Sequence, residues 1–123
     1  MVFSESDFGL LLNKWKDESV SVGTFAFYLD DPESVRSIFL VIGTIKSIDE
    51  TQGRFTISAD DREGSALIGY SGCNLTYGTE AEEHIKGFSE FVVTPPGIED
   101  LVMVEIPDQS LTFVFSLREN AEE

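Results

Sequence analysis

The chain has 123 residues, of which 41% are hydrophobic, and it carries 23 acidic against 8 basic residues, for a net charge of −15. This length and apolar content predict one globular domain over residues 1–123 with a single hydrophobic core. The acidic balance argues against direct binding to nucleic acid or to an anionic membrane, because both kinds of target attract clustered Lys and Arg.

The N-terminal residues predict an amphipathic helix over about 5–17. Ser4 and Asp7 have the spacing of a capping box, with the Ser side chain placed to accept a backbone N–H and the acid placed to accept another. Four apolar residues then recur at helical spacing and predict one buried stripe: Phe8, Leu11, Leu12 and Trp15.

Between residues 20 and 70 the sequence predicts four strands joined by polar turns. The second strand, about 35–48, is far longer than an average strand and carries Gly43 near its middle. Because a flat strand of that length would overrun a small domain, we expect a bend or a bulge at Gly43. Such a bend lets one strand serve both sides of a small barrel.

The patterning is looser from residue 71 to 97, where one short, mostly polar helix is predicted over about 80–86. Thr79 and Glu82 have capping-box spacing at its start. A hairpin ends the regular part of the chain, and its second strand alternates so that four apolar residues share one core face: Leu111, Phe113, Phe115 and Leu117. The predicted fold class is mainly β with a minor helical part, as a small bent antiparallel β-barrel or a highly curved sheet.

The stretch Gly43-Thr44-Ile45-Lys46-Ser47-Ile48-Asp49 is similar to the first motif of the Sm-like small β-barrel family, in which a glycine precedes an aspartate by six positions. The order of an N-terminal helix followed by short, bent antiparallel strands resembles the same family. The resemblance implies a barrel architecture. Gly53 stands where that family has an RNA-contacting asparagine, and the family's Arg-Gly motif on a late strand is absent, so RNA binding is not expected.

Cys73 and His84 are the candidates for a catalytic nucleophile and its base. Each also has an ordinary structural interpretation. A lone Cys is commonly a small buried hydrophobic residue, and a His near a helix C-terminus interacts favourably with the negative end of the helix dipole. The sequence has no phosphate-binding loop, no nucleophile elbow and no regular calcium loop, so neither a cofactor nor a metal is predicted. These observations favour a protein that is not an enzyme.

Acidic residues concentrate in two turns. If the first four strands form an up-and-down meander, the turns at 30–34 and 60–64 lie at the same end of the sheet. Their carboxylates then form a candidate rim for a metal ion or a basic partner: Asp30, Asp31, Glu33, Asp60, Asp61 and Glu63. Ordinary solvated turns explain these residues equally well, because Asp side chains accept local backbone hydrogen bonds.

Two hypotheses of function follow. The first is a non-enzymatic acidic interaction or adaptor module that binds a protein partner, with a basic partner favoured by charge and self-association left open. The second is a small-ligand-binding protein or enzyme with a pocket between the barrel and residues 71–97. The acidic N-terminus and the lack of any apolar run of about 18 residues predict a cytoplasmic protein that does not bind membranes.

Overall fold

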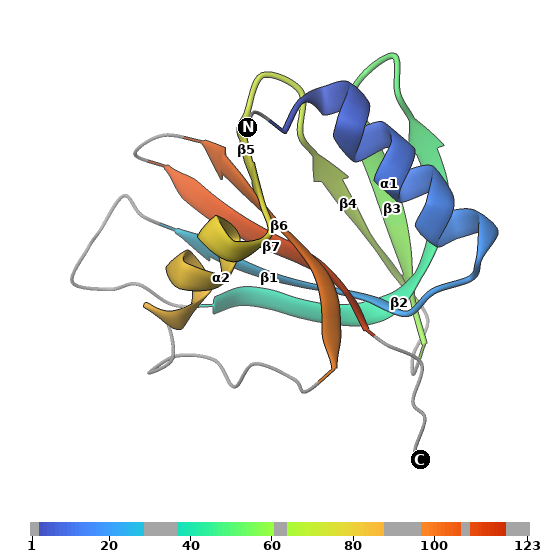
Figure 1. The fold of residues 1–123 in the computed structure, drawn as a ribbon. Coiled ribbons are helices and arrows are strands. Elements are labelled where there is room, and N and C mark those ends of the chain that lie inside the picture. Colours follow the sequence, from blue (N-terminus) through green and yellow to red (C-terminus); the bar gives the residue numbers. More distant parts are fainter. Residues whose placement is uncertain (1–2, 29–36, 61–63, 88–96, 107–108, 118–123) are drawn as a thin grey trace.

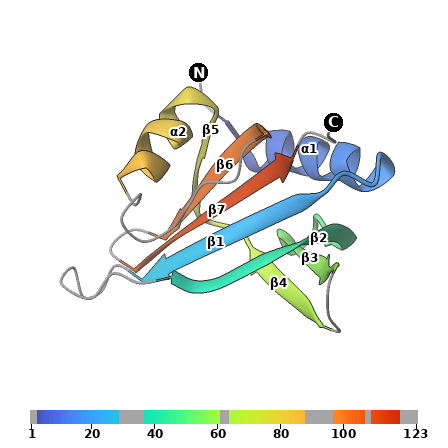
Figure 2. The ribbon, with the colours of Figure 1, turned by 90° about the horizontal axis from the view of Figure 1, so that it is seen from below.

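In the computed structural model, the described residues are 3–28, 37–60, 64–87, 97–106 and 109–117. The elements follow in the order α1 (Glu5–Asp17), β1 (Val22–Tyr28), β2 (Ser37–Asp49), β3 (Arg54–Ala59), β4 (Ser65–Gly69), β5 (Asn74–Tyr77), α2 (Thr79–Lys86), β6 (Ile98–Ile106) and β7 (Ser110–Leu117). The strands form one antiparallel sheet in the order β4-β3-β2-β1-β7-β6-β5. The sheet is strongly curved and does not close (Figures 1 and 2). The predicted fold class is thus confirmed in its curved-sheet form.

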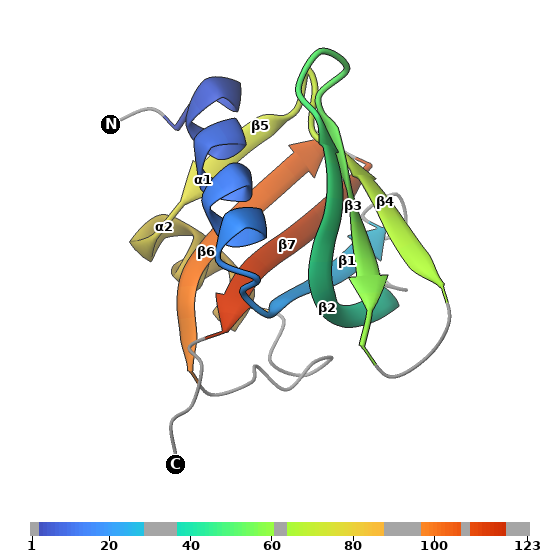
Figure 3. The same cartoon turned by 90° about the vertical axis from the view of Figure 1, so that its right-hand side faces the viewer.

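Strand β2 joins the two halves of the sheet. Its first half pairs with β1 and its second half with β3, and Gly43 belongs to both ladders, opposite Val22 on one side and Ala59 on the other. The strand bends strongly along its length (Figure 3). One long strand therefore serves both sides of the curved sheet, as the sequence predicts.

The register of β2 shifts at two places, and neither is at Gly43: at Ile38 against β1, and at Lys46, three residues beyond Gly43, against β3. The register with β3 shifts at Lys46, and the extra residue allows Ile45 and Ile48 both to pack against the core. Glycine is required at position 43 for another reason. A Cβ atom there would lie 1.8 Å from the backbone oxygen of Ser58, so only glycine allows β2 and β3 to approach this closely.

The two ends of α1 are set by local hydrogen bonds. The Asp7 N–H donates to Ser4 Oγ (3.1 Å), and the Ser4 N–H donates to the Asp7 carboxylate (3.0 Å). The hydrogen bond from the Ser4 backbone N–H, and after it one from the Ser4 side chain, lower the pKa of Asp7 because they favour the ionised carboxylate. At the other end Ser19 has a φ of 51°, and the Val20 N–H donates to the Trp15 carbonyl (3.0 Å) in the manner of a Schellman cap. The predicted helix is confirmed.

The two helices cover opposite faces of the central strands. Alternate residues belong to different core clusters: Val102 and Val114 pack with α1, whereas Met103 and Phe113 pack with α2. Figure 3 shows α1 in front of β6 and β7, with α2 behind them. The alternation in the last hairpin predicts only one core face, but Val114 is 0% exposed. Both faces of this hairpin are therefore core.

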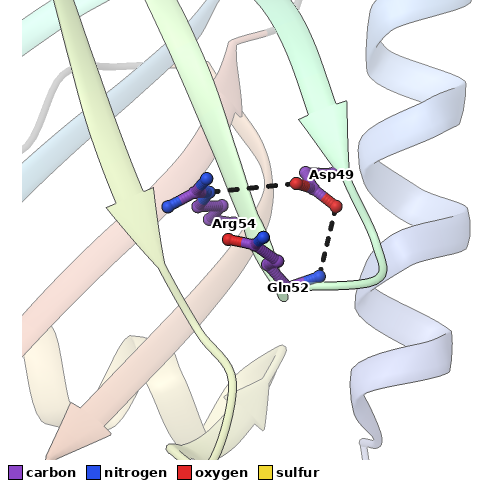
Figure 4. Close-up of polar contacts among 3 residues, drawn as sticks. All are labelled: Asp49, Gln52 and Arg54. Carbon is purple, nitrogen blue, oxygen red and sulfur yellow. Dashed lines mark hydrogen bonds and ion pairs between the residues drawn. The ribbon is translucent and has the colours of Figure 1, made fainter.

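The turn between β2 and β3 is held by Asp49. Its carboxylate accepts the N–H of Gln52 (3.1 Å) and lies 3.9 Å from Arg54 Nε (Figure 4). Gly53 completes the turn with a φ of 65°, and its carbonyl accepts the N–H of Tyr70 (2.7 Å) from the segment after β4. The polar turn predicted here is confirmed, and it also fixes the start of the connection from β4 to β5.

We expect Gly43→Ala to lower the free energy of unfolding by more than the roughly 1–3 kcal/mol that is typical of an overpacked core. The added methyl group meets backbone atoms of β3, which cannot move without opening the ladder. Gly69→Ala is the matched control, because a Cβ there meets no atom within 4 Å and the sheet register is unaffected. Urea unfolding monitored by circular dichroism measures both, and equal midpoints would contradict the role given to Gly43.

Thr24→Val should raise the free energy of unfolding by about 1 kcal/mol. Thr24 lies between Val41 and Val114 on the α1 side of the sheet, and its buried Oγ1 has no hydrogen-bond partner among the described residues. Valine has nearly the same shape and removes the cost of the unpaired hydroxyl. Thr24→Ser keeps the hydroxyl and loses the methyl group, so it should destabilise in the same urea experiment. A Val variant no more stable than the parent chain would show that the hydroxyl is satisfied in solution.

Candidate functional site

Cys73 and His84 are not brought together. Cys73 follows β4 and packs against the α1-side cluster, and burial, with a smaller effect of the Glu5 charge, raises the pKa of its thiol. His84 is exposed on α2, which packs on the opposite face of the sheet. A raised pKa keeps the thiol protonated at neutral pH, which is unfavourable for a nucleophile.

The predicted acidic rim falls largely outside the described residues. The first four strands do form the expected meander, but Asp30, Asp31, Glu33, Asp61 and Glu63 are not described. Asp60 is exposed. The strand pairs next to the two turns lie at different positions along β2. The pair next to the first turn is Phe27 with Ser37, whereas the pair next to the second turn is Ala59 with Gly43. This offset corresponds to roughly 20 Å of strand at about 3.3 Å per residue, so the rim stays a prediction.

A pocket of about 560 Å³ lies beside β5 and is the candidate site. Successive side chains of a strand point to opposite faces, so a pocket that touches consecutive strand residues runs along the edge of that strand. This pocket has seven lining residues among those described, and six of them are consecutive: Phe3, Leu75, Thr76, Tyr77, Gly78, Thr79 and Glu80. The pocket is therefore a groove along the edge of β5, ending at the first turn of α2.

Two stacked aromatic rings form one wall of this pocket. The rings of Phe3 and Tyr77 lie 4.9 Å apart with an interplanar angle of 13°. Phe3 also contacts Phe8 of α1, at 6.0 Å between ring centroids, and Phe8 is fully buried. The wall is thus anchored to the core through α1, although Tyr77 itself is 42% exposed.

A hydrogen bond from the Tyr77 hydroxyl to the Asp100 carboxylate fixes the orientation of the ring. This bond is the main reason that the pKa of Tyr77 rises to about 12, with burial and the charges of Asp100 and Glu99 adding to it. Asp100 is positioned in turn by its backbone N–H, which donates to Ser116 Oγ (3.1 Å). Tyr77 is therefore neutral at physiological pH and remains a hydrogen-bond donor.

The surroundings of the pocket are negatively charged. Glu80 lines it, Asp100 holds Tyr77, and no Lys or Arg is among the described lining residues. The first turn of α2 adds backbone N–H donors, which carry a positive partial charge, because its N-cap is Gly78 and no side chain caps it. The capping box predicted from Thr79 and Glu82 does not form, since the helix already begins at Thr79.

A second pocket of about 300 Å³ lies between α2 and β6. Its floor contains Ile85 and Leu101, which are both buried. Glu82 and Lys86 of α2 lie among its lining residues. In the described part of the chain, no group of three or more His, Cys, Asp or Glu side chains is arranged to hold a metal ion, and no helix is long and apolar enough to cross a membrane.

Sequence reasoning missed β5 and assigned to a site none of the residues that line the larger pocket, although six of the seven lie within the region 71–97, against which the sequence predicts a pocket. The strand has four residues, Asn74 to Tyr77, in which two polar residues alternate with Leu75 and Tyr77. This alternation is a signal for a strand, but four residues are too few to distinguish a strand from a loop. Phe3 lies more than seventy positions away, and nothing local links it to β5.

The chain matches no protein-family model, and it shows no significant similarity to a curated protein or to a solved structure. The geometry of the described residues is therefore the basis for the functional proposals that follow.

We expect the stability of the protein to fall between about pH 10 and pH 12 in part because of Tyr77. Its pKa is raised from 10.0 to about 12 in the folded chain, so the unfolded chain ionises first and the stabilisation present below pH 10 is lost across this interval. Tyr77→Phe removes this contribution.

Urea unfolding of the parent chain and of Tyr77→Phe at a series of alkaline pH values measures the difference. Burial raises the pKa of Tyr70 as well, so both proteins should lose stability, but the variant should lose less. Parallel curves would contradict the hydrogen bond between Tyr77 and Asp100.

Proposed function

We propose that the chain is a non-enzymatic interaction module that binds a basic segment of a protein partner in the pocket beside β5. The observation that carries the proposal is the composition of this pocket, which combines the Phe3–Tyr77 stack with the Glu80 carboxylate and has no Lys or Arg among its described lining residues. Aromatic faces and carboxylates are the groups that bind ammonium and guanidinium side chains. The net charge of −15 adds attraction at longer range and favours encounter with a basic partner.

The aromatic wall is suited to recognition because it is exposed but already ordered. Tyr77 is held by Phe3 on one side and by Asp100 at its hydroxyl, so little side-chain entropy remains to be lost on binding. Tyrosine is also among the residues that most often dominate the energy of an interface. The separation of Cys73 from His84 supports a binding role over a catalytic one.

The pocket between α2 and β6 supports a second candidate function, the binding of a small apolar ligand. Its volume of about 300 Å³ is at the lower end of the range for ligand sites, and Ile85, Ile98 and Leu101 provide apolar surface. This pocket and the one beside β5 both include residues of the region 71–97, against which the second hypothesis expects a pocket. The two functions differ in the elements that a ligand would contact.

The first function is tested with a short acetylated and amidated peptide of alternating Lys and Val, and with the same peptide carrying Glu in place of Lys. Isothermal calorimetry should detect binding of the Lys peptide alone, and the affinity should fall as salt rises, since salt screens exposed charges. Tyr77→Ala should weaken binding by at least about tenfold. Leu67→Ala is the matched control, because Leu67 is a 63% exposed apolar residue on the opposite edge strand.

Equal affinity of the two peptides, or an affinity that Tyr77→Ala leaves unchanged, would contradict the proposal. Backbone chemical shifts locate the binding site independently. Changes confined to Ile85, Ile98 and Leu101 would favour the pocket between α2 and β6 and hence the second candidate function.

A further inference from the structure

The backbone of β5 has a free edge, and the ladder with β6 shows which of its groups point outward. The Gly78 N–H donates to the Leu101 carbonyl (3.0 Å), so these two residues form a hydrogen-bonded pair. Such pairs alternate with non-hydrogen-bonded pairs along an antiparallel ladder. Thr76 therefore bonds inward to β6, whereas the N–H and C=O groups of Leu75 and Tyr77 point away from β6.

These outward groups face the larger pocket. Leu75 and Tyr77 both line it, and no backbone hydrogen bond among the described residues reaches them from outside the ladder. Among the residues that the structure describes, the opposite edge strand, β4, borders a smaller pocket of about 290 Å³. This pocket includes only Leu67 of β4, and its lining also contains Arg54 and its ion-pair partner Asp49.

We propose that the basic segment binds as an additional β-strand on the free edge of β5. Its backbone hydrogen-bonds to the N–H and C=O groups of Leu75 and Tyr77, and its side chains enter the groove on either side. This inference rests on the proposed function, because it specifies how the same pocket holds the same partner. Strand addition gives affinity through the main chain and specificity through alternate side chains.

The side chains of an added strand explain the preference for a basic sequence. A residue directly opposite Tyr77 has its Cβ about 4.5–5.5 Å from that of Tyr77, which places a Lys or Arg side chain beside the aromatic ring. Glu80 lies at the end of the groove and supplies a carboxylate. A cation beside an aromatic ring and a carboxylate gains from both interactions.

The occupant is a partner segment rather than a second copy of this chain. Each copy carries a charge of −15, so two copies repel one another as their edges approach. The outward groups of Leu75 and Tyr77 alone give a short ladder, which cannot readily offset that repulsion. A basic segment forms the same ladder and is attracted instead.

Amide hydrogen exchange in the full chain, measured by NMR with and without the Lys–Val peptide, tests the register. In the free protein Leu75 and Tyr77 should exchange rapidly, whereas Thr76 and Gly78 should be protected by their bonds to β6. At saturating peptide, exchange at Leu75 and Tyr77 should slow by at least about tenfold, while Thr76 and Gly78 change little. Protection that alternates with a period of two is a result that a purely electrostatic complex would not give.

A peptide series with one N-methyl group at each position in turn provides the second measurement. Removal of an N–H should weaken calorimetric binding at the two peptide residues, two positions apart, that pair with Leu75 and Tyr77, and not at the residue between them. Binding without alternate protection and without this pattern would refute strand addition and leave the proposed function standing. If no Lys–Val peptide binds, both proposals are wrong. Protection of Leu75 and Tyr77 that grows with protein concentration alone would identify a second copy as the occupant and overturn the choice of partner.

Discussion

The close approach of β2 and β3 at Gly43 is the constraint on which the rest of the sheet depends. Gly43 is shared by two ladders, and the backbone oxygen of Ser58 occupies the space that any side chain would need. A strand that pairs with β1 along one half and with β3 along the other must bend, and the bulge at Lys46 adds to its twist. The close approach at Gly43 and the bulge at Lys46 thus occur together in the strand that joins the two halves of the curved sheet.

Curvature creates a concave face, and α1 fills it. Phe8 packs edge-on against Tyr70 (4.9 Å between ring centroids) and Phe55 (5.8 Å), two residues supplied by the curved half of the sheet. The first turn of the helix also reaches the connection between β4 and β5, where Glu5 accepts the N–H of Gly72 (3.0 Å). The sheet is therefore closed on its concave side by a helix rather than by pairing of its edges, and β4 and β5 remain as free edges.

The sequence predicts those parts of the fold that local interactions decide. The bounds of α1 follow from the Ser4–Asp7 capping box and the apolar stripe, and the bent β2 follows from an unusual strand length with a central glycine. It does not predict which face each helix covers, because the burial of Val114 depends on α1, about one hundred residues earlier in the chain. The same holds for the candidate site, where Phe3, Tyr77 and Asp100 meet only through the tertiary fold.

A free edge strand normally invites pairing with other chains, and proteins protect such edges with Lys, Pro or bulges. β5 carries neither a charge nor a proline, and its local protection is its short length of four residues. The overall charge opposes self-pairing as well, because copies that each carry −15 repel at separations up to about 8 Å at physiological salt. That repulsion turns into attraction for a basic segment. In the proposed binding mode, the charge that keeps identical edges apart is the same charge that selects the basic partner, and β5 stays free for binding.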